Sequence, residues 1–180
     1  MFPVRLRDDL FLELLELRHA DELYALTDNN REHLRQWLPW LDNTRSAEDT
    51  KAFIRLTRKQ LADDNGFQTA IRYRGALVGV VGQHRVDRAN RATSLGYWLA
   101  KDAAGRGLMT DACHMYIELA FRTMGLHRVE IRCAAENRRS RALPERLGFR
   151  AEGTIRHGEW LYDHYVDLVV YGLLAEEWSR

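Results

Sequence analysis

The sequence predicts an α+β fold with a mixed β-sheet, and three observations support this class. Two β-prone runs, 67–73 and 76–83, follow each other closely, as the two strands of an antiparallel hairpin do. A long segment at 107–124, with apolar residues at helical spacing, predicts an amphipathic helix among further β-prone runs. The 180 residues contain no repeat, linker or low-complexity segment, so we expect one domain spanning residues 1–180.

The N-terminal third is predicted to hold one strand and two helices. Residues 10–17 form the strand, and residues 20–37 form a helix with leucines at helical spacing. Pro39 breaks this helix, because proline lacks the amide hydrogen that an interior helical position uses. Ser46 begins the second helix with a sequence that resembles a capping box, and this helix ends near Gly66.

The rest of the chain is predicted to mix strands with helices. Strands are expected at 67–73, 76–83, 93–99, 127–134, 149–156 and 162–173, and helices at 107–124 and 138–147. The first two strands turn at Arg74-Gly75. In the long helix, residues such as Leu108, Ala112 and Tyr116 recur every three or four positions, which gives it one apolar face. Gly125 ends this helix.

Charge is nearly balanced over the whole chain but not along it. Twenty-seven basic residues against 26 acidic residues leave a formal charge of +1. This balance argues against a protein that binds nucleic acid or a membrane surface through bulk charge. Between residues 122 and 156, however, nine arginines accompany four glutamates and no lysine. That segment is either solvated surface or a site for a ligand that carries phosphate groups.

Cysteine and histidine usage predicts neither a disulfide nor a metal site. Cys113 and Cys133 stand among apolar neighbours without paired-ligand spacing, so we expect buried free thiols. The seven histidines show no HExxH or other metal-ligand spacing. Residues 1–9 lack the apolar run of a signal peptide, and no window approaches the roughly 18 apolar residues of a membrane span. We therefore expect a cytoplasmic protein.

The most informative segment is 95–109, in which a strand leads through a small-residue loop into a helix. Exposed N–H groups at a helix N-terminus bind anions, and glycines let a diphosphate approach the backbone closely. Gly105 and Gly107 fit that role. Their spacing differs from GxxxxGK[ST] and from a full GxGxxG, which argues against nucleoside-triphosphate and dinucleotide sites. Taken alone, the loop fits an ordinary tight turn equally well.

Together with Asn137-Arg-Arg-Ser140 and Leu147-Gly-Phe149, this segment resembles the core of the GNAT acetyltransferase superfamily. The pyrophosphate-binding pattern of that family, [Q/R]xxGx[G/A], falls on residues 102–107, with Asp102 in place of the usual Gln or Arg. The resemblance implies a GNAT fold, in which a mostly antiparallel mixed sheet of about seven strands is flanked by helices on both faces. It also implies acetyl-CoA as cosubstrate and no metal.

Further stretches extend the likeness to one branch of the superfamily. Residues 34–41, 96–99 and 153–160 look like those of the Rim-type group, the ribosomal-protein N-terminal acetyltransferases and their relatives. This likeness covers nearly the whole chain. It indicates that the cofactor is acetyl-CoA but does not identify the acceptor, because relatives with this core acetylate ribosomal proteins, other amines or unidentified substrates.

The resemblance implies a set of site residues. Backbone groups of Trp98 and Leu99 face the pantetheine arm and the thioester, and Asn137 bonds the pantetheine. The loop and first helical turn surround the pyrophosphate with Gly105, Arg106, Gly107, Leu108, Met109 and Thr110. Glu159 corresponds to the glutamate proposed as general base, and Ser140 lies near the sulfur.

The chemistry of amine acetylation independently calls for residues of these types. A protonated amine cannot attack a thioester until it loses a proton, so a carboxylate such as Glu159 is needed as general base. A backbone N–H near Leu99 can stabilise the developing oxyanion, and the Ser140 hydroxyl can protonate the departing thiolate. Each side chain has a plainer alternative, a helix cap for Ser140 and a solvated turn residue for Glu159. Cys133 has no histidine placed by the sequence to activate it as a nucleophile.

Three functions are compatible with these features. The leading hypothesis is an N-acetyltransferase in which an amine attacks acetyl-CoA directly in a ternary complex, the amine being a protein N-terminus such as that of a ribosomal protein. A small-molecule amine, a polyamine or an antibiotic, is the rival acceptor. In the third, the chain senses acyl-CoA without turnover and needs Gly105, Gly107 and Asn137 but not Glu159.

Two secondary expectations accompany these hypotheses. The 3′-phosphate of coenzyme A is expected to bind an arginine among Arg138, Arg139 and Arg141, because guanidinium groups pair well with phosphate. A homodimer is expected from the habit of the family and from an aromatic C-terminal strand region that can offer apolar surface to a partner.

Overall fold

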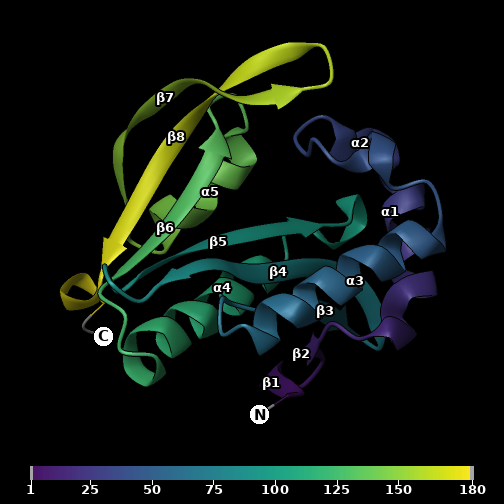
Figure 1. Ribbon diagram of the computed structural model, residues 1–180, viewed down its shortest axis with the longest axis horizontal. Coiled ribbons are helices and arrows are strands. Elements are labelled where there is room, and N and C mark those ends of the chain that lie inside the picture. Colours follow the sequence, from purple (N-terminus) through teal and green to yellow (C-terminus); the bar gives the residue numbers. More distant parts are fainter. Residues whose placement is uncertain (1, 179–180) are drawn as a thin grey trace.

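A computed structural model describes residues 2–178, in which eight strands form one sheet (Figure 1). The strands are β1 (Val4–Arg7), β2 (Leu10–Leu14), β3 (Gln68–Tyr73), β4 (Ala76–Asp87), β5 (Ala92–Leu99), β6 (Arg128–Ala134), β7 (Arg150–Leu161) and β8 (His164–Leu174). The helices are α1 (Ala20–Asn29), α2 (Arg31–Arg35), α3 (Ala47–Ala62), α4 (Leu108–Glu118) and α5 (Arg138–Arg146). A short π-helix, Leu119–Thr123, continues α4.

The strand order in space is β1-β2-β3-β4-β5-β6-β8-β7. Only β5 and β6 run parallel among the paired strands of the described residues; the other neighbours are antiparallel. The predicted mixed sheet is therefore confirmed, with eight strands where about seven were expected. The additional strand, β1, alternates half-buried Val4 and Leu6 with exposed Arg5 and Arg7 at the edge of the sheet. Its two arginines make it resemble a solvated terminus in the sequence.

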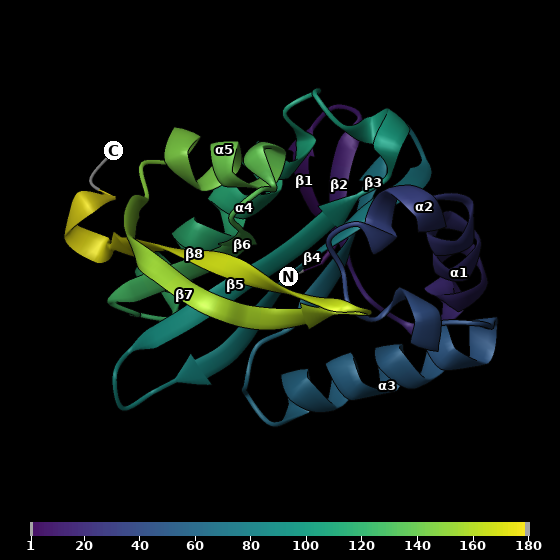
Figure 2. The ribbon, with the colours of Figure 1, turned by 90° about the horizontal axis from the view of Figure 1, so that it is seen from above.

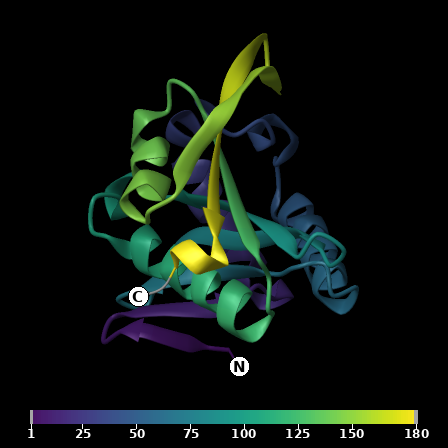
Figure 3. The same cartoon turned by 90° about the vertical axis from the view of Figure 1, so that its left-hand side faces the viewer.

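Helices cover both faces of the sheet, as Figures 2 and 3 show. Neighbouring residues of a strand point to opposite faces. On β3, Ala70 packs with Leu23 of α1 and Ile54 of α3, whereas the next residue, Ile71, packs with Tyr116 of α4. The core is thus divided into a larger part beneath α4 and α5 and a smaller part beneath α1 and α3.

The helix expected over residues 20–37 is instead two helices that meet at Asn30, so that prediction was wrong. The Asn30 amide nitrogen donates to the carbonyl of Leu26 at 2.9 Å, and its side-chain oxygen accepts from the Lys101 N–H at 2.9 Å. An asparagine side chain that bonds to backbone groups competes with helical pairing. Here it also ties the end of α1 to the loop that precedes α4.

Other local predictions are confirmed. The side chain of Ser46 caps α3 by accepting from the Asp49 N–H at 3.3 Å. Arg74 and Gly75 both have positive φ in the turn between β3 and β4, at +51° and +83°. Cys113 and Cys133 are buried free thiols.

No helix of the described residues is both long and apolar enough to cross a membrane.

The parallel strands β5 and β6 separate partway along their length, and this separation positions the site. They pair from Ala92 opposite Arg128 to Leu95 opposite Ile131. Beyond this point β5 continues along β4 to Leu99, while β6 continues along β8. The edges of β5 and β6 that face each other therefore lack a strand partner in this region, and a wedge opens in the sheet.

Candidate active site

A cleft of about 940 Å³ lies at the wedge between β5 and β6. It is lined by residues from several elements, among them Trp37, Gln60, Gly96, Asn137, Ser140 and Glu159. Three residues expected at the site, Asn137, Ser140 and Glu159, thus share one cleft although they come from α5 and β7. Pockets of this size between elements of secondary structure are typical binding sites for small ligands.

Glu159 lies in strand β7, and not in the turn that the sequence suggested. The hairpin turn falls at Tyr162-Asp163, and a β-bulge interrupts the pairing of β7 with β8 between Ile155 and Glu159. The N–H of His157, within the bulge, donates to the Asp167 carboxylate at 2.8 Å. Bulges re-aim the side chains that follow them and are frequent next to active sites. In this strand the bulge directly precedes the residue that lines the cleft.

The carboxylate of Glu159 suits a general base. Among residues 2–178 it has no hydrogen-bond or ion-pair partner, and burial in the cleft raises its pKa above the ordinary glutamate value. A base with a raised pKa accepts a proton more readily near neutral pH than an ordinary glutamate does. The alternative of a solvated turn residue does not describe this side chain, which is half-buried within a strand.

Ser140 is not the cap of α5. That role belongs to Asn137, whose side-chain oxygen accepts from the Ser140 N–H at 3.1 Å. The Ser140 hydroxyl points instead toward the cleft residues Cys133 and Tyr97, at 3.3 Å and 3.4 Å. The Asn137 amide nitrogen is left available for a ligand, since only its oxygen is used by the cap.

The two glycines of the loop between β5 and α4 adopt a backbone conformation suited to glycine. Gly105 and Gly107 have φ of +81° and +76°, in the left-handed region that other residues rarely adopt. Gly107 is the N-cap residue of α4, and no side chain caps this end. The first N–H groups of α4 therefore remain free to bind an anion.

The first turn of α4 contributes through its backbone. Leu108 and Met109 are buried, so their side chains belong to the core and not to the loop surface. The Thr110 hydroxyl is half-buried and accepts from Arg146 at 3.2 Å. Trp98 and Leu99 are half-buried at the end of β5, beyond the point where β6 leaves it. The side of their backbone that faces away from β4 has no strand partner.

Arginines surround this loop. A Cβ placed on Gly107 would lie 3.0 Å from Nη2 of Arg7, and one placed on Gly105 would lie 4.0 Å from Nη2 of Arg139. Arg7 also donates to the Arg106 carbonyl at 3.2 Å. Left-handed glycines, free helix N–H groups and adjacent guanidinium groups together fit the diphosphate and 3′-phosphate of coenzyme A. This local geometry supports the expected cofactor site.

Arg141, one of three arginines considered for the 3′-phosphate, is engaged elsewhere. Its guanidinium donates to the Tyr171 hydroxyl and to the Ala135 carbonyl, both at 2.9 Å. It therefore holds α5 against β8, and Arg139 is the better placed candidate because it lies beside the loop.

Cys133 lines the cleft but is a poor nucleophile. Burial raises the pKa of its thiol, so it stays protonated at neutral pH. No histidine is among its hydrogen-bond partners in the described part of the chain; these partners are Tyr97 and Ser140. The sequence-based argument against a covalent mechanism is consistent with this environment.

Sequence reasoning assigned no role to three residues that matter here. Arg7, on β1, contacts the glycine loop at Arg106, which lies 99 residues later in the sequence. Tyr162, at the β7–β8 turn, contacts the 38–41 segment. Tyr97 contacts Ser140 across the wedge. Only Tyr97 left a signal, since it lies within the 96–99 stretch that resembles the family.

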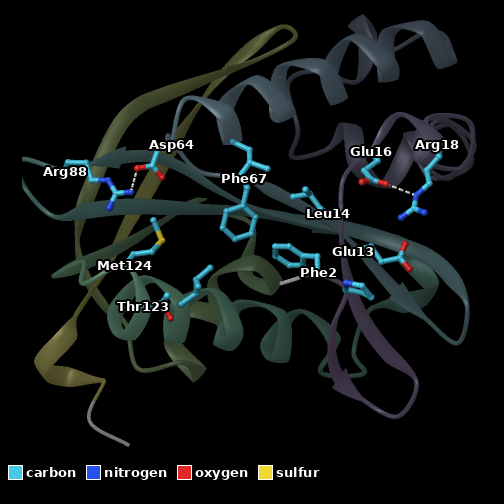
Figure 4. Close-up of a pocket in the computed structure, with 13 residues that line it drawn as sticks. Phe2, Glu13, Leu14, Glu16, Arg18, Asp64, Phe67, Arg88, Thr123 and Met124 are labelled. Atoms are coloured by element: carbon cyan, nitrogen blue, oxygen red, sulfur yellow. Dashed lines mark hydrogen bonds and ion pairs between the residues drawn. The ribbon is translucent and has the colours of Figure 1, made fainter.

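A second hollow, of about 680 Å³, lies outside the wedge (Figure 4). Its floor is apolar, with Phe2, Phe67 and Met124, and charged pairs stand at its ends, such as Arg18 with Glu16 at 2.9 Å. No residue expected at the active site lines it. Its charged groups are already paired, so it offers no free base or phosphate-binding group. Within residues 2–178 no group of three or more metal-binding side chains occurs.

Fold and cleft define a coenzyme A-dependent acyltransferase, and comparison with known proteins specifies the family. The family model of the acetyltransferase (GNAT) domain matches residues 9–150 of the chain. The chain therefore belongs to the GNAT acetyltransferases, and it is an acetyl-CoA-dependent N-acetyltransferase.

Three relatives illustrate the likeness. The chain is 38% identical to YdaF of Bacillus subtilis (strain 168), provisionally named a ribosomal N-acetyltransferase, over 99% of this chain and 98% of YdaF. It is 27% identical to the ribosomal-protein-serine acetyltransferase of Escherichia coli (strain K12), over 96% and 97% of the two chains. The crystal structure of the microcin C7 self-immunity acetyltransferase MccE, in complex with acetyl-CoA and AMP, superimposes with a TM-score of 0.91 at 26% identity, over 96% of both chains.

Proposed function

We propose that this protein acetylates the N-terminal α-amine of a protein, with Glu159 as general base and Ser140 as proton donor to the leaving group. The observation that carries the proposal is the unpaired Glu159 carboxylate, with its raised pKa, in the same cleft as the Ser140 hydroxyl. The names of the B. subtilis and E. coli relatives, both of which refer to ribosomal acetylation, support this choice of acceptor.

The two substrates would approach from different faces of the sheet. The glycine loop, the start of α4 and Arg139 of α5 would hold acetyl-CoA, which supplies the acetyl thioester. On the opposite face, the cleft is walled by Gln60 of α3 and by the loop from Trp37 to Pro39. The acceptor amine would enter along this second wall, so that the two substrates meet at the wedge.

In the proposed transfer, the bond that forms is matched by one that breaks, and each proton has a donor and an acceptor. The amine nitrogen forms a bond to the acetyl carbon while the carbon–sulfur bond breaks, and the electron pair of that bond leaves with the sulfur. Glu159 accepts the proton released by the amine, and Ser140 donates a proton to the sulfur. Solvent in the open cleft then takes the proton from Glu159 and returns one to Ser140. An unpaired N–H on the free side of β5, near Leu99, can stabilise negative charge on the carbonyl oxygen.

A small-molecule acceptor is the second candidate. The similarity to MccE, whose crystal structure holds AMP beside acetyl-CoA, favours it. The third reading, a sensor without turnover, does not account for the unpaired base in the cleft.

A competition among acceptors tests the proposal. Purified protein would be incubated with acetyl-CoA and one of three acceptors: a peptide with a free N-terminal serine, the same peptide with a blocked N-terminus and an internal lysine, or spermidine. Acetylation would be located by mass spectrometry. We expect the free N-terminal peptide to be modified at its α-amine with the highest kcat/KM. Preferential modification of spermidine would contradict the proposal and favour the small-molecule reading.

We also propose that two copies associate through the β7–β8 hairpin. β7 is an edge strand, and Ile155, Trp160 and Tyr165 are exposed by 40%, 49% and 55%. Exposed apolar side chains on a hairpin that contains an edge strand favour association. Sedimentation should give a species of about twice 21.0 kDa at micromolar concentration; a 21.0 kDa species alone would contradict the dimer.

A further inference from the structure

Tyr97 joins the two sides of the wedge beside the proposed proton donor. It lies on β5, two residues past the last pair with β6. Its hydroxyl donates to the Ser140 carbonyl at 3.2 Å and accepts from the Ser140 hydroxyl at 3.4 Å. One phenol thus contacts both the main chain and the side chain of the same serine.

Cys133 completes this cluster from the other strand. Its sulfur lies 3.3 Å from the Ser140 hydroxyl and 3.9 Å from the Tyr97 hydroxyl. The thiol is a weak donor and acceptor, whereas the tyrosine is a normal hydrogen-bonding group. Tyr97 is therefore the stronger of the two restraints on Ser140.

The environment keeps the Tyr97 hydroxyl neutral. Burial raises its pKa well above the usual tyrosine value, so the phenol retains its proton and continues to donate to the Ser140 carbonyl. A catalytic hydroxyl is pre-organised for its role when neighbouring groups hold it in one rotamer. The contacts of Tyr97 therefore help to set the orientation of the Ser140 hydroxyl.

We propose that Tyr97 is a positioning residue for acetyl transfer, which holds the Ser140 side chain in one rotamer at the wedge; the hydroxyl hydrogen that Tyr97 accepts in the free protein turns to the sulfur of the leaving group during transfer. This inference rests on the function proposed above for Ser140. Tyr97 itself exchanges no proton with the substrates. Its two hydrogen bonds fix the start of α5 and the orientation of the serine side chain.

Kinetics of Tyr97→Phe tests this, because the substitution removes only the hydroxyl. Loss of two neutral hydrogen bonds corresponds to a fall in kcat of roughly 5-fold to 150-fold. The KM for acetyl-CoA should stay within about twofold, since the pyrophosphate loop is untouched. Ser140→Ala should lower kcat further, and the double variant should equal Ser140→Ala alone because the hydroxyl that Tyr97 positions is already absent.

Tyr171→Phe is the matched control. The Tyr171 hydroxyl also bonds to α5, through Arg141 at 2.9 Å and Glu145 at 2.7 Å, but does not touch Ser140. It should change thermal stability without reducing kcat. Cys133→Ala, a second variant, should lower kcat less than Tyr97→Phe does.

The possible results separate this inference from the proposed function. Full kcat in Tyr97→Phe, additive losses in the double variant, or equal losses in Tyr171→Phe would overturn the positioning role while leaving Ser140 as donor. Equal losses in Cys133→Ala would likewise attribute the effect to packing in the wedge and overturn it. Full activity of Ser140→Ala would overturn the proposed donor and the positioning role together.

Discussion

The hydroxyl of Tyr162, at the turn of the β7–β8 hairpin, accepts a hydrogen bond from the Leu41 N–H at 3.2 Å and donates to the Leu38 carbonyl. The guanidinium of Arg35 lies over the ring of Tyr162, 3.8 Å from its centroid. A hairpin that carries Glu159 is thereby fastened to the loop that walls the acceptor side of the cleft, and Figure 1 shows the hairpin tip beside α2.

Tyr162→Phe should loosen this contact and weaken acceptor binding. Loss of two hydrogen bonds to the 38–41 loop is expected to raise the KM for the acceptor by about 5-fold to 150-fold. Acetyl-CoA binding should not change, because the glycine loop lies elsewhere. Tyr165→Phe is the control, since Tyr165 lies on the same hairpin and its hydroxyl makes no hydrogen bond within residues 2–178. An unchanged acceptor KM in Tyr162→Phe would contradict a role for this contact.

The pH dependence of kcat/KM should report Glu159. The residue acts as a base only when ionised, and burial raises its pKa. Activity should therefore fall, as pH is lowered, at a higher pH than an ordinary glutamate with pKa of about 4.3 would give. His84 also lines the cleft, and burial lowers its pKa, so its protonation falls in the same acid range.

Two variants distinguish these groups. Glu159→Gln should lower kcat by about 10²-fold to 10⁴-fold, the usual contribution of a general base. His84→Gln should leave the acid limb of the profile in place. Loss of that limb in His84→Gln would assign the titration to the histidine and contradict the assignment of Glu159.

Gly107→Ala should weaken acetyl-CoA binding, and the loss of thermal stability that it causes should not account for the weaker binding. A left-handed φ costs about 1 to 2 kcal/mol for alanine, and the new Cβ would lie 3.0 Å from Nη2 of Arg7. Gly75→Ala is the matched control, since φ there is +83° and a Cβ would meet nothing within 4 Å. Both should lose similar thermal stability, but calorimetry should show weaker binding, by at least about tenfold, only for Gly107→Ala. Equal affinities in the two variants would argue against the loop as the pyrophosphate site.

Arg139→Ala should also lower the affinity for acetyl-CoA. A hydrogen bond between charged groups contributes about 1.5 to 3 kcal/mol, or roughly 10-fold to 100-fold in Kd. The neighbouring Arg138→Ala should have a small effect, because only Arg139 approaches Gly105. Titrations at low and high salt should show a smaller salt dependence for Arg139→Ala than for the wild type. The reverse order of the two variants would move the phosphate contact to Arg138.

Local chemistry made part of this architecture predictable. The turn at Arg74-Gly75, the Ser46 cap and the start of a helix after Gly107 follow from residue types acting on their own backbone. The central parts of most strands were likewise visible as β-prone runs. Such features depend on few neighbours, so one sequence is enough to infer them.

The remaining features depend on contacts between distant segments. Arg7 reaches the loop after β5 from the edge strand β1, and Tyr97 meets Ser140 only because β5 and β6 separate. Glu159 lies within a strand because a bulge absorbs extra residues in β7, and nothing in the local sequence marks the bulge apart from Gly158. These relationships come from the register of the sheet, which local patterns do not determine.

The proposed role of Glu159 is in catalysis and not in cofactor binding. Its most direct test measures, for the wild type and for Glu159→Gln, both the Kd for acetyl-CoA by calorimetry and the rate of N-terminal acetylation of a serine-initiated peptide by mass spectrometry. We predict equal Kd values within about twofold and a rate at least 10²-fold lower in the variant. An undiminished rate in Glu159→Gln would contradict this role.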